Sequence, residues 1–322
     1  MQRFLKSLLL FCAISISSVN ANTNPIRVAL DDLPGVDMLP TLIAIERAKE
    51  RGLNIKVSYM LSEGMAMRTI LNKQADIGMG TPYQKVQETG AAIRMFYQLN
   101  MLRFHPVVDT RYYTSWDELD GVDMYSHGKG SGTEALVNMM AKKHGITYGK
   151  MVYLPGSGVR ANAMVNGRIH ATVVDTERKN QLIYRPKSPF KVLPIEKIDA
   201  TDEALFANEA FISANQKELG ILVEELLFVW SRMNLEPVFI LDQRNNYGLL
   251  PKVADIKILQ YVQEMVAEGA FPNDGGRASA FAADIAFYGF AGTIKQPEKQ
   301  TLEQFWDFSI LDQALDSSSV VQ

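Results

Sequence analysis

Short apolar runs alternate with segments of helical periodicity along the first two thirds of the chain. Residues 26–31 (IRVALD) and 54–60 (NIKVSYM) have the length and the branched apolar content of buried strands. Between them, apolar residues from Leu39 to Ile45 recur at helical spacing, and Gly52 follows where helices often end. The same alternation predicts strands over 76–80, 91–99, 122–126, 151–154, 169–174 and 190–195, and helices over 65–73, from 81, up to 144 and up to 166. This pattern is typical of a parallel α/β fold.

Beyond residue 195 the pattern becomes almost entirely helical. Helices are predicted over 217–234, 255–268, 279–290 and 301–316. The segment 280–290 is apolar nearly all round, which indicates a buried helix or an intersubunit surface. Burial is the favoured interpretation. Only a short polar tail follows, from Ser317.

The amino terminus has the pattern of a secretory signal peptide. Arg3 and Lys6 precede an apolar run over 8–16, and Val19 and Ala21 fit the −3 and −1 positions of a cleavage site. The apolar run is half the roughly 20 residues that a membrane span requires. We therefore expect residues 1–21 to be removed and the mature protein to be a soluble periplasmic protein.

Composition narrows the chemistry further. The chain has 322 residues, with 33 Lys and Arg against 36 Asp and Glu, and its single cysteine, Cys12, lies in the signal peptide. The mature chain can form no disulfide, zinc-thiolate site or cysteine nucleophile. Its four histidines have no metal-binding spacing, and no basic stripe suits nucleic acid. We expect no metal, no cofactor, no catalytic residue and no nucleic-acid partner.

Candidate ligand-binding residues follow from where each predicted strand ends, because ligands of open α/β sheets lie outside the carboxyl ends of the strands. Three glycines in 128–132 precede a helix, where backbone N–H groups can approach an acceptor. Acidic residues end the first strand and the strand before 176. The predicted ligand-binding residues are Asp31, Asp32, Glu63, Gly64, Thr81, Gly130, Ser131, Gly132, Thr133, Ser157, Asp175 and Thr176.

Several of these residues also have a purely structural interpretation. Ser131 and Glu134 have the spacing of a capping box, and a cap and a ligand-binding loop can coexist at one helix start. Thr81 can cap the helix that begins with Pro82. Asp31 or Asp32 can serve as caps or turn residues. Tyr112 and Tyr113, near the expected first crossover, are core residues more often than cleft residues in such a position.

The order of these motifs resembles that of a known family. The signal peptide is followed by NKQADIGMGTP at 72–82, SWDELDG at 115–121, GKGSGTE at 128–134 and NGRIHATVVD at 166–175. Together they resemble the type II periplasmic substrate-binding proteins of ABC importers, in the sulfonate, nitrate and thiamine-precursor group, over about residues 25–270. The resemblance implies two lobes joined by two crossovers that close on a ligand. We expect lobe 1 over 22–110 and 208–322, and lobe 2 over 111–207.

Three functions are compatible with this resemblance. The first is a monomeric solute-binding protein that delivers a small molecule to an ABC permease. The second is a soluble sensor for a membrane receptor, and the third is an enzyme on the same fold, which the export signal and the lack of nucleophile motifs disfavour. Acidic residues dominate the strand ends, and Arg160 is the only base expected nearby. The sequence therefore favours a nitrogen heterocycle or an amine over a bare oxyanion.

Overall fold

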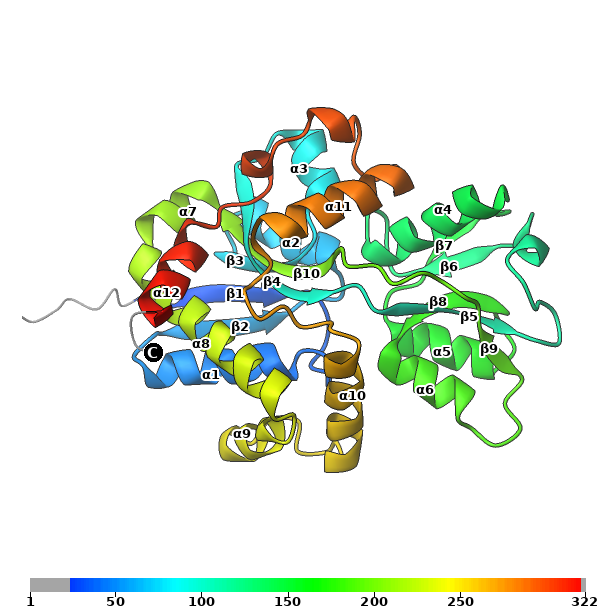
Figure 1. Ribbon diagram of the computed structural model, residues 1–322, viewed down its shortest axis with the longest axis horizontal. Coiled ribbons are helices and arrows are strands. Elements are labelled where there is room, and N and C mark those ends of the chain that lie inside the picture. The colour runs from blue at the N-terminus through cyan, green and yellow to red at the C-terminus, as the bar shows by residue number, and fades with distance from the viewer. Residues whose placement is uncertain (1–23, 320–322) are drawn as a thin grey trace, which may run out of the picture.

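The computed structural model describes residues 24–319 and shows two lobes, each built on a five-stranded sheet with helices on both faces (Figure 1). This architecture confirms the predicted two-lobed α/β fold. The signal peptide and Cys12 lie outside the described residues. Among the helices of residues 24–319, none is long and apolar enough to cross a membrane.

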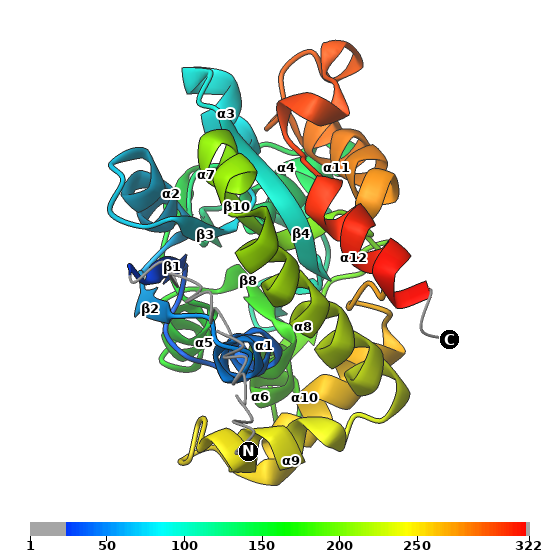
Figure 2. The same ribbon diagram turned by 90° about the vertical axis from the view of Figure 1, so that its left-hand side faces the viewer.

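The first sheet has the strand order β2-β1-β3-β10-β4. Its strands are β1 (Ile26–Leu30), β2 (Ile55–Tyr59), β3 (Ile77–Gly80), β4 (Ile93–Met101) and β10 (Thr201–Asn208). Strands β1 and β2 run parallel, with Val28 opposite Val57, whereas β10 is antiparallel to both of its neighbours. Helices α1 (Leu39–Glu50) and α8 (Gln216–Leu235) cover one face, and α2 (Glu63–Leu71) covers the other (Figure 2).

The second sheet has the order β7-β6-β8-β5-β9. Its strands are β5 (Phe104–Asp109), β6 (Met124–Ser126), β7 (Met151–Tyr153), β8 (Ala171–Asp175) and β9 (Phe190–Val192). Helix α4 (Gly132–His144) lies on one face, and α5 (Ser157–Val165) and α6 (Thr176–Ile183) lie on the other (Figure 1). Here β5 is the antiparallel strand. Each sheet thus contains one strand that runs against the others.

The remaining helices belong to the first lobe. They are α3 (Tyr83–Thr89), α7 (Glu209–Ala214), α9 (Phe239–Tyr247), α10 (Asp255–Ala267), α11 (Arg277–Ala291) and α12 (Ser309–Ser319). Helices α10 and α11 also reach the second lobe, where they contact α6 and α4. Helix α11 buries Phe287 and Tyr288, but Phe290 is exposed, so this helix is buried on one face only.

Two strands were missing from the predicted pattern. Strand β5 follows β4 after a break at 102–103, and β10 occupies a region for which the pattern predicts almost only helices. Strand β10 begins with the polar residues Thr201, Asp202 and Glu203, which hide the alternation of a strand. Its place between β3 and β4 comes from pairing with residues more than a hundred positions earlier, which local periodicity does not report.

The predicted helix over 301–316 is also corrected. A short 3₁₀ turn over Leu302–Gln304 comes first, closed by a reciprocal cap between Thr301 and Gln304. The chain is then extended, and Trp306 bridges to Met95 beside the first sheet. Helix α12 begins only at Ser309. Pairing with the sheet edge therefore interrupts a segment whose periodicity alone is helical.

The chain passes between the sheets twice. It leaves the first sheet after Met101 and returns to it at Thr201. Both changes of sheet come several residues before the expected lobe boundaries at 110/111 and 207/208. We propose that the lobe boundaries lie at these two crossovers, near residues 102–103 and 199–200.

Gly132, the first residue of α4, marks a close approach between the lobes. A Cβ atom there would lie 2.6 Å from Cδ1 of Leu102 and 3.2 Å from the Tyr288 hydroxyl. We expect Gly132→Ala to lower the free energy of unfolding by about 1–3 kcal/mol, because the packed neighbours must move. Denaturant unfolding measures this change. Gly220→Ala in α8 is the matched control, since nothing lies within 4 Å of its Cβ; an equal loss in both variants would contradict the prediction.

Candidate functional site

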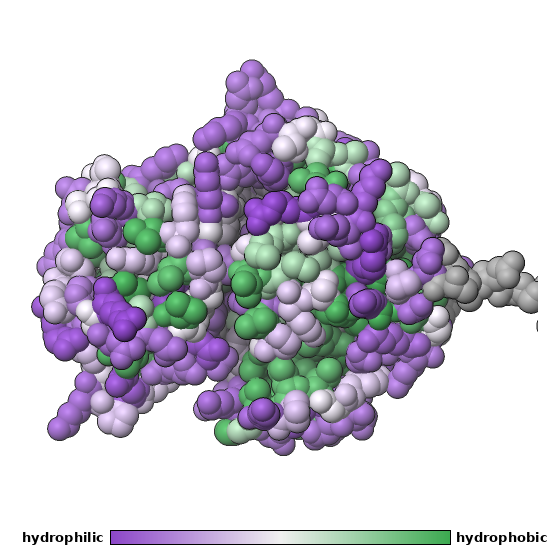
Figure 3. Space-filling view, turned by 180° about the vertical axis from the view of Figure 1, so that it is seen from behind, coloured by the Kyte–Doolittle hydropathy of each residue, from purple (hydrophilic) through white to green (hydrophobic). Residues whose placement is uncertain are grey.

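A cavity of about 80 Å³ is lined by residues of both lobes, at the ends of strands from both sheets. It adjoins a wider groove of about 440 Å³ that shares Glu63, His127 and Ser131 with it. Figure 3 shows the molecule from behind, with hydrophobic residues on either side of the seam between the lobes. The residues that line the cavity are Asp31, Asp32, Asp37, Glu63, Asn100, Arg103, Phe104, His127, Ser131, Gly132, Thr133, Ser157, Asp175, Thr176, Asp202, Glu203, Tyr261 and Met265.

The predicted ligand-binding residues all come to this cleft. Nine of them line the cavity itself, namely Asp31, Asp32, Glu63, Ser131, Gly132, Thr133, Ser157, Asp175 and Thr176. Gly64, Thr81 and Gly130 line the adjoining groove instead. The strand-end rule thus locates one continuous surface, while contact with a ligand stays a prediction.

Asp31 directly follows β1 and is the most buried of the acids that line the cavity. Its side chain is 8% exposed, and Oδ1 has no hydrogen-bond partner among the described residues. Burial, with the charges of Glu63 and Asp32, raises the pKa of the Asp31 carboxyl well above its usual range. An unpaired buried carboxyl group is costly, so this residue is suited to a partner that arrives from outside.

Glu63 begins α2 and reaches β3. Its Oε1 accepts hydrogen bonds from the backbone N–H and the hydroxyl of Thr81. Burial nevertheless raises the pKa of Glu63 to about 7. The prediction that Thr81 caps α3 is wrong, because α3 begins at Tyr83 with Pro82 as its N-cap residue and no side chain caps it. The Thr81 hydroxyl donates to Glu63.

Three further acids line the cavity and were not predicted. Asp37 lies just before α1, and Asp202 and Glu203 lie at the start of β10. Burial raises the pKa of Asp37 to about 7, and burial together with neighbouring carboxylates raises the pKa of Asp202 and Glu203 well above the usual range. In the sequence, Asp202 and Glu203 are visible only as an acidic pair in TDEALF. Their position at the cavity follows only from the pairing of β10 with β3 and β4.

The second lobe contributes capped helix starts. The hydroxyl of Ser131 accepts from the N–H of Glu134 at 3.4 Å, and Glu134 accepts from the N–H of Gly130 at 2.6 Å. The Ser131 cap is confirmed, but the reciprocal half of the capping box is not formed, because Glu134 accepts from the N–H of Gly130 and not from that of Ser131. Asp175 caps α6 by accepting from the N–H of Arg178 at 2.7 Å. These residues therefore shape the cleft and satisfy helix ends at the same time.

The expected base and the observed base of the site differ. Arg160 is fully buried and donates to the carbonyls of Val173 and Leu154 and to the Ser157 hydroxyl, so it supports the loop from behind and does not line the cavity. The expectation that Arg160 is the base of the site is thus wrong. Arg103, at the first crossover, lines the cavity instead. Arg103 belongs to no recognisable sequence motif, because it is a single arginine in the connection between β4 and β5.

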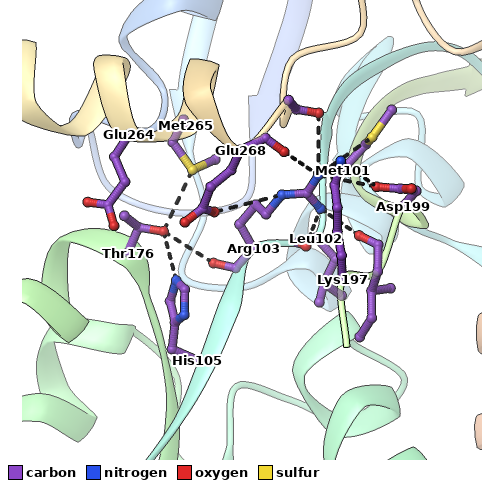
Figure 4. Close-up of polar contacts among 12 residues, drawn as sticks. Met101, Leu102, Arg103, His105, Thr176, Lys197, Asp199, Glu264, Met265 and Glu268 are labelled. Carbon is purple, nitrogen blue, oxygen red and sulfur yellow. Dashed lines mark hydrogen bonds and ion pairs between the residues drawn. The ribbon is translucent and has the colours of Figure 1, made fainter. Parts of the chain in front are cut away.

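Direct contacts hold the two lobes together beside the cavity (Figure 4). Glu264 on α10 forms an ion pair with Lys179 and accepts from Asn180 at 2.6 Å, both of them on α6. The Thr176 hydroxyl on α6 also contacts Sδ of Met265 on α10 at 3.7 Å, and within the second lobe it bonds to Nε2 of His105 at 3.0 Å. Burial lowers the pKa of His105 to about 4, so this ring is neutral at neutral pH. The lobes are therefore in contact around the cleft.

Other candidate chemistry lies elsewhere or is missing from the described part of the chain. Tyr112 stacks on His170 at 3.8 Å between ring centres, and neither Tyr112 nor Tyr113 lines the cavity. No group of three His, Asp or Glu side chains within residues 24–319 is arranged to hold a metal ion. The lining of the cavity is strongly polar, because seven acidic residues from the two lobes contribute to it.

Comparison with solved structures places this architecture among known proteins. A protein of Bordetella bronchiseptica RB50 superposes with a TM-score of 0.74 at 16% identity, over 92% of this chain and 98% of that chain. The nitrate-binding protein NrtA of Synechocystis PCC 6803 gives a TM-score of 0.71 at 13% identity, over 92% and 89% of the two chains. The alkanesulfonate-binding protein SsuA of Xanthomonas axonopodis pv. citri gives 0.65 at 13% identity, over 85% and 95%.

Sequence comparison adds nothing to this, since no protein-family model and no curated protein matches the chain. The solved structures include binding components of ABC importers, and their identity to this chain is low. The likeness extends over both lobes and over both crossovers. The chain therefore has the fold of periplasmic binding proteins, in the form found in sulfonate-binding and nitrate-binding proteins.

Proposed function

We propose that this protein is an extracytoplasmic solute-binding protein that captures a small cationic or N–H-rich molecule between its lobes and delivers it to an ABC permease in the inner membrane. The observation that carries the proposal is the buried, unpartnered Oδ1 of Asp31 in a cavity lined by seven carboxyl groups. The expected export signal supports the setting, and so do two structural neighbours that are named as periplasmic, a sulphonate-binding and a nitrate-binding protein.

The charge of the cavity determines the class of ligand. One arginine, Arg103, faces seven carboxyl groups, and the lining contains no lysine. A bare oxyanion would meet like charges in a partly desolvated space, where burial must be offset by opposite charge. A protonated amine or a heterocycle with N–H groups supplies what these carboxylates lack. The proposed ligand therefore differs from the sulfonates and nitrate that the structural neighbours are named for.

Capture follows from the placement of the acids on both lobes. Asp31 and Glu63 come from the first lobe, and Asp175 comes from the second. A cation between them interacts with both lobes only when the lobes are closed. Its differential affinity for the closed state shifts the population toward that state, which the permease then recognises. No bond in the ligand needs to change.

A thermal-shift screen tests the function. We expect amines and cationic heterocycles to raise the melting temperature, since a ligand at 100 times its Kd adds about 2.7 kcal/mol to the stability of the native state. Sulfonates, nitrate and other oxyanions of similar size are the matched controls and are expected to leave it unchanged. A shift with the oxyanions alone would overturn the ligand class, and turnover of a hit would favour an enzyme.

A further inference from the structure

Two residues that line the cavity each have one buried side-chain atom without a hydrogen-bond partner, and the two atoms are of opposite kinds. One is the acceptor Oδ1 of Asp31, and the other is the donor Nε–H of Arg103. Both residues are 8% exposed, and both line the same cavity. No other cavity-lining side chain among residues 24–319 has a buried polar atom without a partner. Buried polar groups are nearly always bonded, so this pair indicates two complementary groups on one ligand.

The rest of the Arg103 guanidinium group is already occupied (Figure 4). Its NH1 donates to the carbonyls of Leu102 at 2.8 Å and Ile198 at 2.5 Å, and its NH2 donates to the carbonyl of Glu268 at 3.0 Å. These bonds join both crossovers to the end of α10. In Figure 4 the Nε edge points toward the Glu268 carboxylate, which lies 3.8 Å away, beyond hydrogen-bond distance, on the side where Thr176 and Met265 also lie. The Nε–H is therefore the one donor of the group that has no hydrogen-bond partner among the described residues.

The charge of Arg103 is largely balanced as well. Asp199 lies 3.3 Å from its NH2, and the Glu268 carboxylate lies 3.8 Å from its Nε. A ligand carboxylate at Nε would therefore meet Glu268 and the acids of the cavity without an unpaired positive charge to offset them. A neutral acceptor, such as a carbonyl oxygen, gains the Nε–H bond without that repulsion.

We infer that the ligand carries two groups, a protonated nitrogen that binds Asp31 and a neutral carbonyl-type acceptor that binds Nε of Arg103. This inference rests on the proposed function and narrows it from cations in general to donor–acceptor molecules such as amino amides. Simple alkylamines lack the acceptor, and amino acids carry a charged one. Arg103 is then a specificity-determining residue as well as a connection between the crossovers.

Three matched series of probes test the inference on the unaltered protein. They are the ω-amino amides with one to three methylene groups, and the alkylamines and ω-amino acids of the same lengths. Isothermal titration or competition by NMR gives each affinity. At one length at least, we expect the amide to bind ten times tighter than the alkylamine and the amino acid. Equal or weaker binding of the amide at every length would overturn the inference.

A variant locates the acceptor contact. Arg103→Lys removes Nε–H and is expected to abolish the preference for the amide over the alkylamine while both still bind. Glu268→Gln perturbs the surroundings of Arg103 but keeps Nε–H, so the preference should remain. If both variants weaken all probes equally, Arg103 acts only through the crossovers and the inference is wrong. If no ammonium probe binds the unaltered protein at all, it is the proposed cation-binding function that fails.

Discussion

Asp31→Asn is expected to weaken binding of a cationic ligand about 30-fold or more, because truncating one partner of a buried charge pair costs about 2–5 kcal/mol. The same change should stabilise the ligand-free protein by about 1–3 kcal/mol, since it removes an ionisable group whose charge is disfavoured by burial and by the neighbouring carboxylates. Titration calorimetry gives the affinity, and denaturant unfolding gives the stability. A damaged fold would lower both the affinity and the stability, so lower affinity together with higher stability indicates a lost ligand contact.

Glu88→Gln provides the control for the Asp31 variant. Glu88 carries the same charge but lies on the adjoining groove, exposed and paired with Lys85 at 3.4 Å. An exposed pair of this kind is worth little, so neither affinity nor stability should change by more than about 1 kcal/mol. Equal weakening of binding in both variants would show that overall charge, and not the buried Asp31 contact, attracts the ligand.

The buried acids of the cavity are expected to lower the stability of the ligand-free protein as the pH rises from about 4 to above 7, whereas His105, whose pKa is lowered to about 4, acts in the opposite direction up to about pH 6.5. Burial raises the pKa of Asp37 and Glu63 to about 7, so the folded protein holds protons that the unfolded chain has already released. The stability that these groups contribute is fully present below their unfolded pKa and is lost as the pH passes through the folded pKa. Melting scans from pH 4 to 8 measure this, with an expected drop of a few kcal/mol, and Asp37→Asn with Glu63→Gln should flatten the curve.

Ligand affinity is expected to change in the opposite direction. A bound cation favours ionised carboxylates, so binding releases protons and becomes up to about tenfold tighter per pH unit for each proton released. Calorimetry between pH 5 and 8, in buffers of different ionisation enthalpy, counts these protons. Affinity that is independent of pH, with no proton release in either buffer, would show that the acids of the cavity do not face the ligand.

Much of the site could be predicted because it depends on local signals. Strand ends and helix caps follow from a few neighbouring residues, so Asp31, Asp175 and the Ser131 cap are recognisable in the sequence and lie at the cleft in the structure. Parallel strands of one lobe all end on the same side of their sheet. The sequence alone was therefore enough to place an acidic surface between two α/β lobes.

The tertiary structure decided which other residues complete that surface. Strands β5 and β10 enter each sheet from the opposite lobe, so they run antiparallel and begin at the cleft. Their first residues, Phe104, Asp202 and Glu203, line the cavity, although a rule based on strand ends does not consider strand beginnings.

The limited reach of local sequence patterns also explains why Arg160, and not Arg103, was expected to line the cavity. Arg160 follows a loop that does reach the cleft, yet its side chain turns inward to backbone carbonyls, whereas Arg103 lies at a crossover that no local pattern marked. Sequence pattern thus determined the alternating α/β architecture, the Ser131 cap and the acidic character of the strand ends, and the resemblance to periplasmic binding proteins implied the two lobes. The tertiary structure decides which arginine lines the cavity, which three further acids join it and which carboxyl groups have a raised pKa. All three depend on burial and on pairing between distant segments, which arise only when both crossovers are formed.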